Sequence, residues 1–454
     1  MIIRDPVHGD IYFGDRKDNN FEKEVIETKQ MQRLRGIKQL GTAYLVYPGA
    51  THTRFEHSLG TAHLVKIIMD NVHRNGYRID ENLREAISIA GLLHDVSHIP
   101  FGHTFEDERW IFKKHDSRIE QFLHDNELSD VLESKTTLKD EVTGMLKEAN
   151  EGWLDSEAYC KENMPWKKQI IKGTIGADLL DYVRRDAYYT GLSLNYDNRI
   201  FNYFKVDEDT NELYLDLMKH KMNRTDARSE VLRVLRMRFF LMERVYYHHT
   251  KLSAGSIISK AVEIAEKDHG LVEKDLYWHS DTTFLDHLLN FDDNTIESLI
   301  MGVKSRKLLK RAYVISSNIK REKKINFQLD ERLTKNRLYT EREIIDRANK
   351  NSTTKLEDAD IIIYMLNPQI FKEADIKVKF DNEIQPLNKG IVHQAMDVKE
   401  VEESYETLWK LYVFAPANAC KRVGNVCESM FRIKNEFIPQ EYDYIETLDK
   451  WMKR

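Results

Sequence analysis

Cysteine is scarce in this sequence, which has three, at positions 160, 420 and 427, among 454 residues. They form no CxxC pair and cannot build a disulfide framework, which is typical of a reducing cytoplasm. Nowhere do about 18 apolar residues run together, as a membrane-spanning helix requires. The opening MIIRDPVHGD also lacks the basic region and apolar stretch of a secretory signal. We therefore expect a cytoplasmic protein with no membrane partner.

The sequence has no excess of positive charge either, since 69 lysines and arginines face 75 acidic residues and the net charge is −6. Nothing attracts nucleic acid to the molecule as a whole, so any such binding has to be local. With 41% hydrophobic residues, a chain of this length can bury a large core. We predict a mainly α fold, with a helical core over residues 1–300 and a smaller α+β lobe over residues 301–454.

Histidines, in contrast, are concentrated around one His-Asp pair, His94-Asp95. Residues 90–117 have the sequence AGLLHDVSHIPFGHTFEDERWIFKKHDS, which also holds His98, His103 and His115. Imidazole binds divalent metals and titrates near neutrality, so this density indicates a metal site with acid/base groups beside it. An apolar stripe at three-and-four spacing places His94 on the buried face of a helix, with Asp95 beside that face. His98 shares the stripe if the helix continues, although a proline ends it soon after.

Two further segments are predicted to be helices that present metal-binding side chains. In RFEHSLGTAHLVKIIMDNVHRNG, His57 shares a face with apolar residues, and Gly60 permits close helix packing. In IIKGTIGADLLDYVRRDAYYTG, an apolar face turns acidic at Asp178 and Asp186. A buried carboxylate without a partner is strongly unfavourable, and a divalent cation would supply one partner.

Together, His57, His94, Asp95 and Asp178 form a set of two imidazoles and two carboxylates drawn from three helices. Such a set suits Fe, Mn, Zn, Ni or Mg and excludes none of them. Taken singly, each residue has an ordinary structural explanation, because a histidine on an apolar face is usually a core residue and a lone Asp178 would form a salt bridge. Because they occur together, we expect one divalent metal per active site.

The motifs RFEHSLG, HDVSHIPFGHTFE and ADLLDYVRRD, in this order, resemble those of the HD-domain metal-dependent phosphohydrolases. Within them the chain is similar to the deoxynucleoside triphosphate triphosphohydrolases, without the SAM domain of the animal members. The similarity extends from RDPVHGDIYF at residue 4, through QMQRLRGIKQLGTAYLVYPGATHTRFEHSLG, to MRFFLMERVYYHH near residue 249. It implies an HD-domain helical core, a dNTP substrate accompanied by Mg²⁺, and a homotetramer that a nucleotide activates.

The resemblance also implies roles for individual residues, and it makes the four residues above the metal ligands. The residues around the α-phosphate would be His98, His103, Glu106 and His115. The substrate contacts would be Arg54 and Arg238 to phosphate, Tyr182 and Asp186 to the deoxyribose, and Gln39, Leu40 and Tyr246 to the rest of the nucleoside.

The chemistry of triphosphate hydrolysis fits these residue types. Arginines bind phosphate through two hydrogen bonds, and a metal polarises the attacked phosphoryl group and lowers the pKa of bound water. Water attack at the α-phosphorus would release tripolyphosphate and a deoxynucleoside, and an imidazole would protonate the departing 5′-oxygen. We assign that acid to His103, oriented by Glu106, with His98 and His115 as competing candidates.

Several of these residues have structural alternatives that the sequence leaves open. Arg54 could pair with Glu56 or another acid, and Arg238 on an inward helix face could pair with a buried carboxylate rather than a phosphate. Tyr182 and Tyr246 could be core aromatics with one satisfied hydroxyl. His115, in KKHDS, could lie at a solvated helix start.

The sequence departs from the family pattern at three places. Glu106 stands where the animal members have aspartate. Leu179 occupies the position where animal members have a phosphate-binding lysine, so one phosphate contact is missing or moved. Gln32 and Arg35 match a regulatory guanine-nucleotide site, but Glu27 replaces its guanine-reading aspartate and Arg4 replaces an asparagine. A nucleotide activator remains an expectation with its base open, and an ordinary polar helix face is the alternative.

The two ends of the chain carry β patterns. The opening IIRDPVHGDIYF predicts a short hairpin with its turn near His-Gly-Asp. After residue 355, the runs ADIIIYML, ADIKVKF and ETLWKLYVFAP predict strands of the α+β lobe, which by resemblance helps subunits assemble. The basic stretch at residues 304–327 could touch nucleotide or nucleic acid, but we favour a solvated helix face.

Other functions of HD-domain proteins can be weighed on the same motif. HDVSHIP has neither the lysine of the HDxGK motif in cyclic-di-GMP phosphodiesterases nor the acidic pair that follows HD in alarmone hydrolases. The remaining alternatives are an HD-type nuclease that uses the basic stretch and a regulatory protein that binds nucleic acid in response to a nucleotide.

Overall fold

The structure is a computed structural model of the chain. It describes residues 1–14, 21–135, 137–147, 164–319, 327, 330–350, 352–366, 376–387 and 392–437, so Cys160 lies outside the described residues. Helices predominate, which confirms the prediction of a mainly α fold. The N-terminal hairpin is present as predicted, with Ile2–Asp5 antiparallel to Gly9–Tyr12.

The helices and strands follow one another in a mixed order. The helices up to residue 269 are α1 (Phe21–Glu27), α2 (Lys29–Gln32), α3 (Arg54–Arg74), α4 (Glu81–Leu93), α5 (Ile119–Phe122), α6 (Glu127–Glu133), α7 (Leu138–Leu146), α9 (Trp166–Lys172), α10 (Ala177–Thr190), α11 (Thr225–Leu241) and α12 (His249–His269). Those that follow are α13 (Asp281–Leu288), α14 (Asn294–Lys304), α16 (Glu331–Thr334), α17 (Arg337–Asn349), α18 (Val392–Glu406) and α19 (Cys420–Phe431). The strands are β1 (Ile2–Asp5), β2 (Gly9–Tyr12), β3 (Phe204–Asp207), β4 (Glu212–Asp216), β5 (Met218–Lys219), β6 (Met222–Asn223), β7 (Lys310–Ser316), β8 (Ile362–Met365), β9 (Lys377–Phe380), β10 (Glu383–Pro386) and β11 (Lys410–Ala415).

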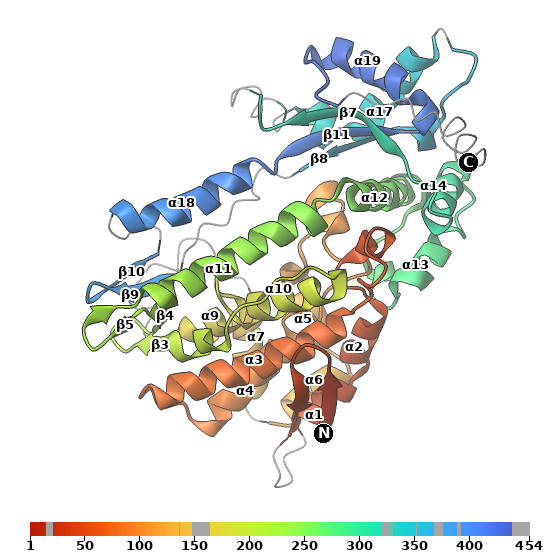
Figure 1. Cartoon of the computed structure of the whole chain (residues 1–454). Helices are drawn as coiled ribbons and strands as arrows, with labels where there is room; N and C mark the ends of the chain where they lie inside the picture. The colour runs from red at the N-terminus through yellow and green to blue at the C-terminus, as the bar shows by residue number, and fades with distance from the viewer. Residues whose placement is uncertain are drawn as a thin grey trace, which may run out of the picture.

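Helices α3, α4 and α10 pack together in the lower half of the molecule (Figure 1). A capping box starts α3, in which the backbone N–H of Thr53 donates to the Glu56 carboxylate at 2.5 Å. The side chain of Asp80 caps α4. Helix α4 ends at Leu93, so His98 lies in the turn that follows rather than on the same helical stripe. The segment with His98 and His103 therefore lies in the loop that follows α4 and not in a helix of the bundle.

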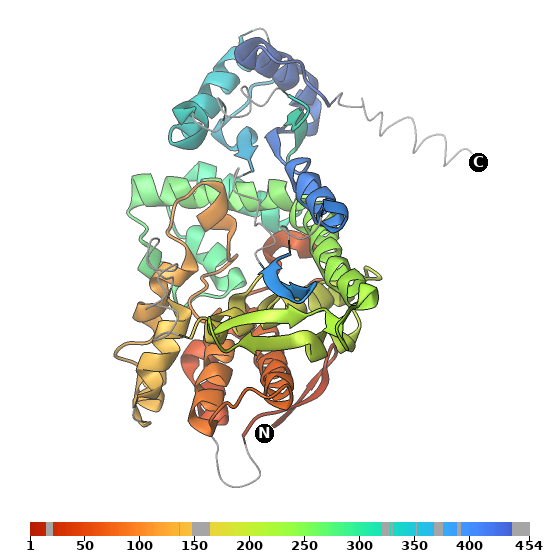
Figure 2. The ribbon, with the colours of Figure 1, turned by 90° about the vertical axis from the view of Figure 1, so that its left-hand side faces the viewer.

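A four-stranded sheet in the order β10-β9-β4-β3 joins two distant parts of the sequence. Strand β9 lies parallel to β4, with Leu215 opposite Val378. Figure 2 shows the blue strands of residues 377–386 beside the yellow-green strands of residues 204–216. The run ADIKVKF, predicted to be a strand of the C-terminal lobe, therefore forms a sheet with the segment that follows α10. From there α18 lies along α11, where the rings of Tyr405 and Phe239 are 5.4 Å apart, and leads back to the upper part of the molecule.

The upper part of Figure 1 contains a three-stranded antiparallel sheet in the order β7-β11-β8, packed against α17 and α19. Strand β7 corrects the prediction for the described part of the basic stretch, residues 304–319; residues 320–326 lie outside the described residues. We expected a solvated helix face, but Lys310–Ser316 is an edge strand paired with β11. The physical reason is the run Ala312–Ile315, whose four side chains are buried and outweigh the basic residues around them.

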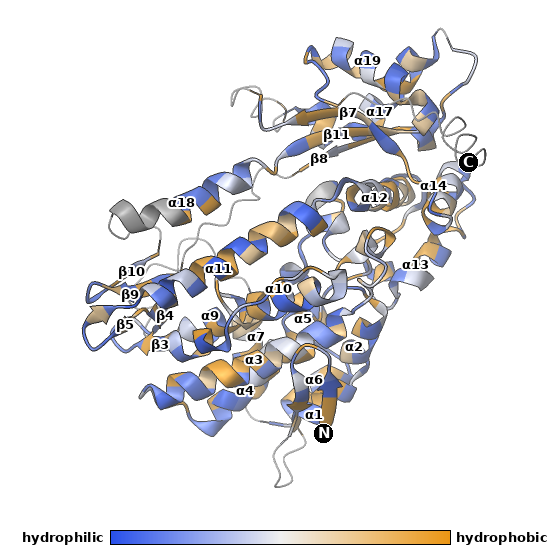
Figure 3. Ribbon diagram, in the orientation of Figure 1, coloured by the Kyte–Doolittle hydropathy of each residue, from blue (hydrophilic) through white to orange (hydrophobic). Residues whose placement is uncertain are grey.

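Two hydrophobic clusters form the core. The first lies between the hairpin, α1 to α11 and the returning segments 376–387 and 398–408. The second lies between α12, α14, α17, α19 and the upper sheet. In Figure 3, apolar and hydrophilic residues alternate along α3 and α11, as expected for helices with one face toward a core. Among the described helices, none has both the length and the apolar character needed to cross a bilayer. The division at residue 300 stays a prediction.

Candidate metal centre

Three helices bring His57, His94 and Asp178 together. The Nε2 atoms of His57 and His94 are 3.1 Å apart, and Asp178 Oδ1 lies 3.1 Å from the first and 3.8 Å from the second. His57 is in α3, His94 follows the last residue of α4, and Asp178 is in the first turn of α10. Both histidines are buried, whereas the Asp178 side chain is 32% exposed. The cluster is thus open to solvent on the side of α10.

The hydrogen bonds behind the two imidazoles leave their Nε2 lone pairs facing each other. His57 Nδ1 donates to Asp181 Oδ2 at 2.7 Å, and His94 Nδ1 donates to the backbone oxygen of Gly91 at 2.9 Å. In the neutral rings, each Nε2 is therefore an acceptor, so two lone pairs and a carboxylate oxygen converge with no proton between them. A divalent cation satisfies this arrangement, and the donor set of two nitrogens and carboxylate oxygen is suitable for it.

Burial and the neighbouring charges act in opposite directions on the pKa values of these three residues. Burial alone lowers the pKa of His57, but its hydrogen bonds to Asp178 and Asp181 outweigh burial and raise that pKa to about 10. At His94 burial outweighs the nearby carboxylates of Asp95 and Asp178, and the pKa is lowered. The pKa of Asp178 is lowered, since its hydrogen bond to His57 outweighs its burial.

Asp95, the fourth residue of the predicted set, lies at the edge of the cluster. Its Oδ1 is 3.5 Å from His94 Nε2, and its Oδ2 is 3.9 Å from His57 Nε2. Arg54 donates from Nη1 to Oδ2 of the same carboxylate at 2.5 Å. Burial raises the pKa of Asp95, but His94, His98 and Arg54 outweigh burial and hold it well below its usual range. The carboxylate is therefore ionised beside the two imidazoles.

His98, His103 and His115 form a second cluster next to Asp95. The rings of His98 and His115 are stacked with centroids 3.8 Å apart, and the His103 ring meets both edge-on. His98 is buried, with Nε2 3.3 Å from Asp95 Oδ1, whereas the His103 side chain is 52% exposed. Neither ring nitrogen of His98 has a hydrogen-bond partner among the described residues. Burial lowers the pKa of His98 well below its ordinary value.

Glu106 lies beneath the histidine cluster, in the π-helical turn η3 (Thr104–Glu108). Its Oε2 accepts from His103 Nδ1 at 3.1 Å and lies 3.4 Å from His115 Nδ1, and its Oε1 accepts from the buried Arg118. Burial raises the pKa of Glu106, but the hydrogen bonds from His103 and His115 outweigh burial and hold that pKa far below its usual range. One buried carboxylate thus orients two imidazoles through their Nδ1 atoms.

Of the two predicted phosphate-binding arginines, Arg238 lacks an acidic partner. The residue is 9% exposed, no carboxylate of the described residues pairs with its guanidinium, and its Nε has no hydrogen-bond partner there. It lies 6.0 Å from the ring of Tyr405 on α18. Arg54, in contrast, pairs with Asp95, and Glu56 belongs to the helix cap instead.

The predicted sugar residues, Tyr182 and Asp186 of α10, lie near each other and contact Tyr246, which follows α11. The rings of Tyr182 and Tyr246 are 6.4 Å apart, and the Tyr246 hydroxyl donates to Asp186 Oδ2. The other oxygen of Asp186 is 2.8 Å from His52 Nε2. The backbone N–H of Gln39 donates to the His52 backbone oxygen at 3.0 Å. Leu40, the next residue, is 6% exposed and starts a 3-10 turn. Binding of nucleoside by these residues stays a prediction.

The four residues predicted to hold an activating nucleotide make contacts of different kinds. Gln32 accepts from Arg35 Nε at 2.9 Å, and the Arg35 guanidinium lies 3.7 Å from the Phe55 ring centroid. Arg4 pairs with Asp10 across the hairpin at 2.9 Å. Glu27 is exposed and lies 3.8 Å from Lys23. Their role as a nucleotide site stays a prediction.

Six residues that hold these groups in place were not predicted from the sequence, namely His8, His52, Asp181, Arg185, Arg118 and Tyr405. Asp181 and Arg185 occur in the same ADLLDYVRRD motif as Asp178, at the spacing that lets them pair on one helix. That spacing is a signal that the sequence offered. His52 and Tyr405 gave none, because their contacts join segments far apart in the chain.

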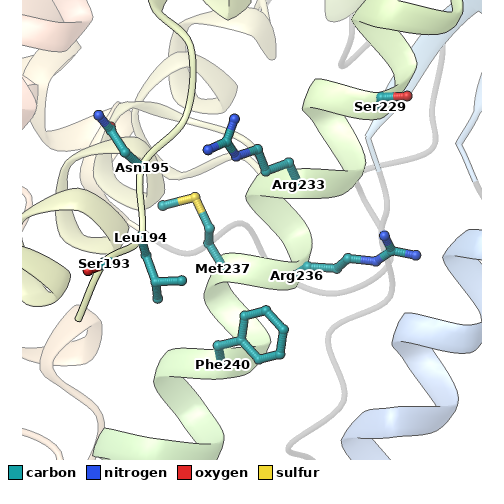
Figure 4. Close-up of a pocket in the computed structure, with 8 residues that line it drawn as sticks. All are labelled: Ser193, Leu194, Asn195, Ser229, Arg233, Arg236, Met237 and Phe240. Carbon is teal, nitrogen blue, oxygen red and sulfur yellow. The ribbon is translucent and has the colours of Figure 1, made fainter.

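Two surface pockets lie on the other side of α10 and α11. One, of about 200 Å³, is lined by Ser193, Leu194, Asn195, Ser229, Arg233, Arg236, Met237 and Phe240. Figure 4 shows Arg233 and Met237 extending from α11 toward the 193–195 segment, while Arg236 points away from it. The other is lined by Pro6, Val7, Arg184, Tyr188 and residues 192–195. Neither lining includes a residue of the metal or histidine cluster.

Comparisons with known proteins agree with this geometry. The family model of the HD domain matches residues 54–186, and that of the HD-associated region matches residues 230–440. The chain therefore contains an HD domain, as its motifs predicted, followed by an HD-associated region.

Particular relatives can then be named. The chain is 31% identical over 291 residues to deoxynucleoside triphosphate triphosphohydrolase SAMHD1 of Gallus gallus, a match that covers 58% of this chain and 45% of that protein. It is 30% identical over 273 residues to the uncharacterized protein YwfO of Bacillus subtilis, with 59% and 56% covered. The chain thus spans about half the length of these two relatives. It is 28% identical over 447 residues to the uncharacterized protein MJ1154 of Methanocaldococcus jannaschii, with 96% and 84% covered.

Two solved structures share the fold. A hypothetical protein from Aquifex aeolicus has a TM-score of 0.65 at 20% identity, covering 94% of this chain and 99% of that one. A phosphohydrolase from Bacteroides thetaiotaomicron has a TM-score of 0.63 at 20% identity, covering 92% and 99%. The similarity extends over nearly the whole chain, so the arrangement of both cores belongs to the fold.

Proposed function

We propose that the protein hydrolyses deoxynucleoside triphosphates to deoxynucleoside and tripolyphosphate. The observation that carries the proposal is the juxtaposition of two sites. His57, His94 and Asp178 offer an electron-rich site for a cation, and the His98, His103 and His115 cluster begins at Asp95, 3.5 Å from His94. The likeness to SAMHD1 triphosphohydrolases, at 31% identity, supports the choice of substrate.

A divalent cation bound by His57, His94, Asp95 and Asp178 would polarise the attacked phosphoryl group and activate water. The chain's own residues would do the rest. As water adds to the α-phosphorus, the bond to the 5′-oxygen breaks, and that oxygen takes a proton from an imidazolium. We assign this proton to His103, because Glu106 orients its ring through Nδ1 while half of its side chain stays open to solvent, where a substrate can reach it. His98 and His115 remain competing candidates.

The triphosphate needs cationic partners, and Arg238 is the best placed of them. It is buried without a carboxylate partner among the described residues, which is costly unless an anion reaches it. Arg54 would contribute by bridging Asp95 and a phosphate oxygen. Tyr182, Asp186, Gln39, Leu40 and Tyr246 would enclose the nucleoside, and Asp186 would read the sugar.

The finer properties follow the same family pattern. We propose a cytoplasmic homotetramer in which Arg4, Glu27, Gln32 and Arg35 help to bind an activating nucleotide. Light scattering of the purified protein with and without a dNTP mixture tests the assembly. A chain that stays monomeric in both conditions contradicts it.

The decisive experiment incubates the purified protein with each dNTP and with Mn²⁺ or Mg²⁺. We expect deoxynucleoside and tripolyphosphate in equal amounts, separated by ion-pair chromatography. The matched reactions use the corresponding ribonucleotides and a single-stranded oligonucleotide. Cleavage of the oligonucleotide with no turnover of any dNTP, alone or in a mixture, would replace the proposal by the nuclease alternative.

A further inference from the structure

The N-terminal hairpin reaches the metal centre through one buried carboxylate, that of Asp181. His8, in the hairpin turn, donates from Nε2 to Asp181 Oδ1 at 2.6 Å, and its side chain is 3% exposed. The other oxygen of Asp181 accepts from Nδ1 of the metal-centre residue His57 at 2.7 Å. One carboxylate therefore connects residue 8 with residue 57, and neither bond is exposed to solvent.

Arg185 completes the surroundings of Asp181. Its Nε donates to Oδ2 at 2.8 Å and its Nη2 to Oδ1 at 2.9 Å, so each oxygen accepts two hydrogen bonds. The pKa of Asp181 is held well below its usual range, because Arg185 and the two histidines outweigh its burial. All four acceptor positions are used, and the plane of the carboxylate is fixed.

The hairpin turn is tied to the same arginine. Asp5 Oδ1 accepts from the backbone N–H groups of Val7 and His8 at 2.9 and 2.8 Å, and Asp5 Oδ2 accepts from Arg185 Nη1 at 2.7 Å. The turn closes at Gly9, whose φ of +80° favours glycine. Asp5 thus sets both the conformation of the turn and its position over α10.

Helix α3 leaves room for this arrangement at one position. A Cβ atom on Gly60 would lie 1.9 Å from Asp181 Oδ1 and 2.4 Å from Arg185 Nη2. Any other residue there would push the Asp181 carboxylate out of place. Three residues therefore supply four N–H donors to the Asp181 carboxylate, and Gly60 leaves the space that the carboxylate occupies.

We propose that His8 is a positioning residue of the metal centre, which acts by holding Asp181 against His57 and so aims His57 Nε2 at the cation. The inference rests on the metal centre of the proposed function but not on its substrate. The groups that orient a metal-binding histidine typically change metal affinity about 10- to 100-fold when they are removed. The hairpin is thus part of the active centre, although it touches no metal ligand directly.

The test measures Mn²⁺ binding to the metal-stripped full chain by calorimetry, with electron paramagnetic resonance of the bound ion. We expect His8→Ala to weaken Mn²⁺ binding about tenfold and to broaden the signal, and Asp181→Asn to weaken it more. His8→Gln should restore most of the affinity, because its amide can donate to Asp181. His73→Gln, an exposed histidine at the end of α3, and Asp10→Asn, an exposed carboxylate on the same hairpin, should bind as the wild type does.

Melting curves in EDTA separate positioning from folding. If His8→Ala has a lower melting temperature than the wild type, His8→Leu takes its place, because leucine fills the space of the imidazole without supplying a donor. The Mn²⁺ affinities of His8→Gln and His8→Leu are then compared. Unchanged Mn²⁺ affinity and signal in a folded variant without the donor would overturn the inference, as would a wild-type chain that binds no Mn²⁺. His8-dependent Mn²⁺ binding in a chain that turns over no dNTP would uphold the inference and refute the substrate.

Discussion

Each imidazole of the metal centre is oriented by a neighbour that faces away from the cation site. Asp181 holds His57, and the Gly91 backbone oxygen holds His94. The same principle applies in the histidine cluster, where Glu106 holds His103. Chemistry at this site therefore depends on two sets of residues, those that face the cation site and those that orient them. Substitutions in the two sets should have different effects.

Removing a residue that faces the cation site should abolish turnover without unfolding the chain. We expect His94→Ala and Asp95→Ala to lower dNTP hydrolysis by at least about 1,000-fold, because neither half of the ligand set suffices alone. Circular dichroism and metal content complete the measurement. His73→Ala, an exposed histidine on α3, is the control. Full activity in either of the first two variants would contradict the site.

Asp186 should determine the choice of sugar. Its carboxylate is held by His52 and Tyr246, so it has a fixed position beside Tyr182. We expect Asp186→Ala to narrow the ratio of kcat/KM for dNTP over NTP about tenfold, which corresponds to roughly one lost hydrogen bond. Asp209→Ala, on an exposed turn, should leave that ratio unchanged. An unaltered ratio in Asp186→Ala would remove its sugar-reading role.

At the scale of residues, the sequence allows prediction of those site residues that lie in recognisable motifs. His57, His94 and Asp178 come together as expected, because helical spacing places each on an inward face. Their binding of metal stays a prediction. His8 and His52 could not be found in this way, because their partners are 173 and 134 residues away and no spacing rule spans such distances.

At the scale of elements, the packing of α3 against α10 depends on Gly60. A methyl group there would overlap Asp181 and Arg185, so we expect Gly60→Ala to destabilise the fold by about 2 kcal/mol or more. At Gly144, within α7, a methyl group would meet no other atom within 4 Å, so Gly144→Ala should be neutral or stabilise by about 0.5 kcal/mol. Urea unfolding of both variants tests the difference. Equal stabilities would show that α3 and α10 can move apart at no cost.

Element boundaries were harder to predict than element faces. The stripe through α4 was predicted correctly up to His94, but the helix stops there, and His98 is reached through a turn. Strand β7 was predicted to be a helix face because the basic residues on either side outnumber the short apolar run Ala312–Ile315, which is buried. In both places a few local residues determine the secondary structure, although the pattern of the longer segment predicts something else.

At the scale of the whole molecule, buried ion pairs join the loop that carries Glu106 to the later helices. Arg109, directly after η3, pairs with Glu263 on α12 and with Glu341 on α17, and Lys260 lies 2.9 Å from Glu341. Glu341 also accepts from the backbone N–H of Ile363 in β8 at 2.9 Å. These contacts hold the loop of Glu106 against the second hydrophobic cluster.

Glu341→Gln should lower the free energy of unfolding at pH 7 by about 3 kcal/mol, because Arg109 and Lys260 lose their shared partner in the interior. Burial raises the pKa of Glu341, but the two cations outweigh burial and hold it below its ordinary 4.5. Its contribution is therefore complete above about pH 4.5 and is lost as the pH falls toward the folded pKa. The free energy of unfolding, measured in urea, should fall more steeply between pH 7 and pH 3.5 for the wild type than for Glu341→Gln. Parallel curves would contradict this account.

The mixed sheet also has a consequence for biosynthesis. Strand β4 ends at Asp216, but its partner β9 begins at Lys377, so a ribosome must add about 160 residues before that edge is covered. Until then the nascent chain presents an open strand edge, the kind of surface on which polypeptides aggregate. Completion of the four-stranded sheet thus waits for the last quarter of translation, and shortened transcripts would yield a protein that needs chaperones to stay in solution.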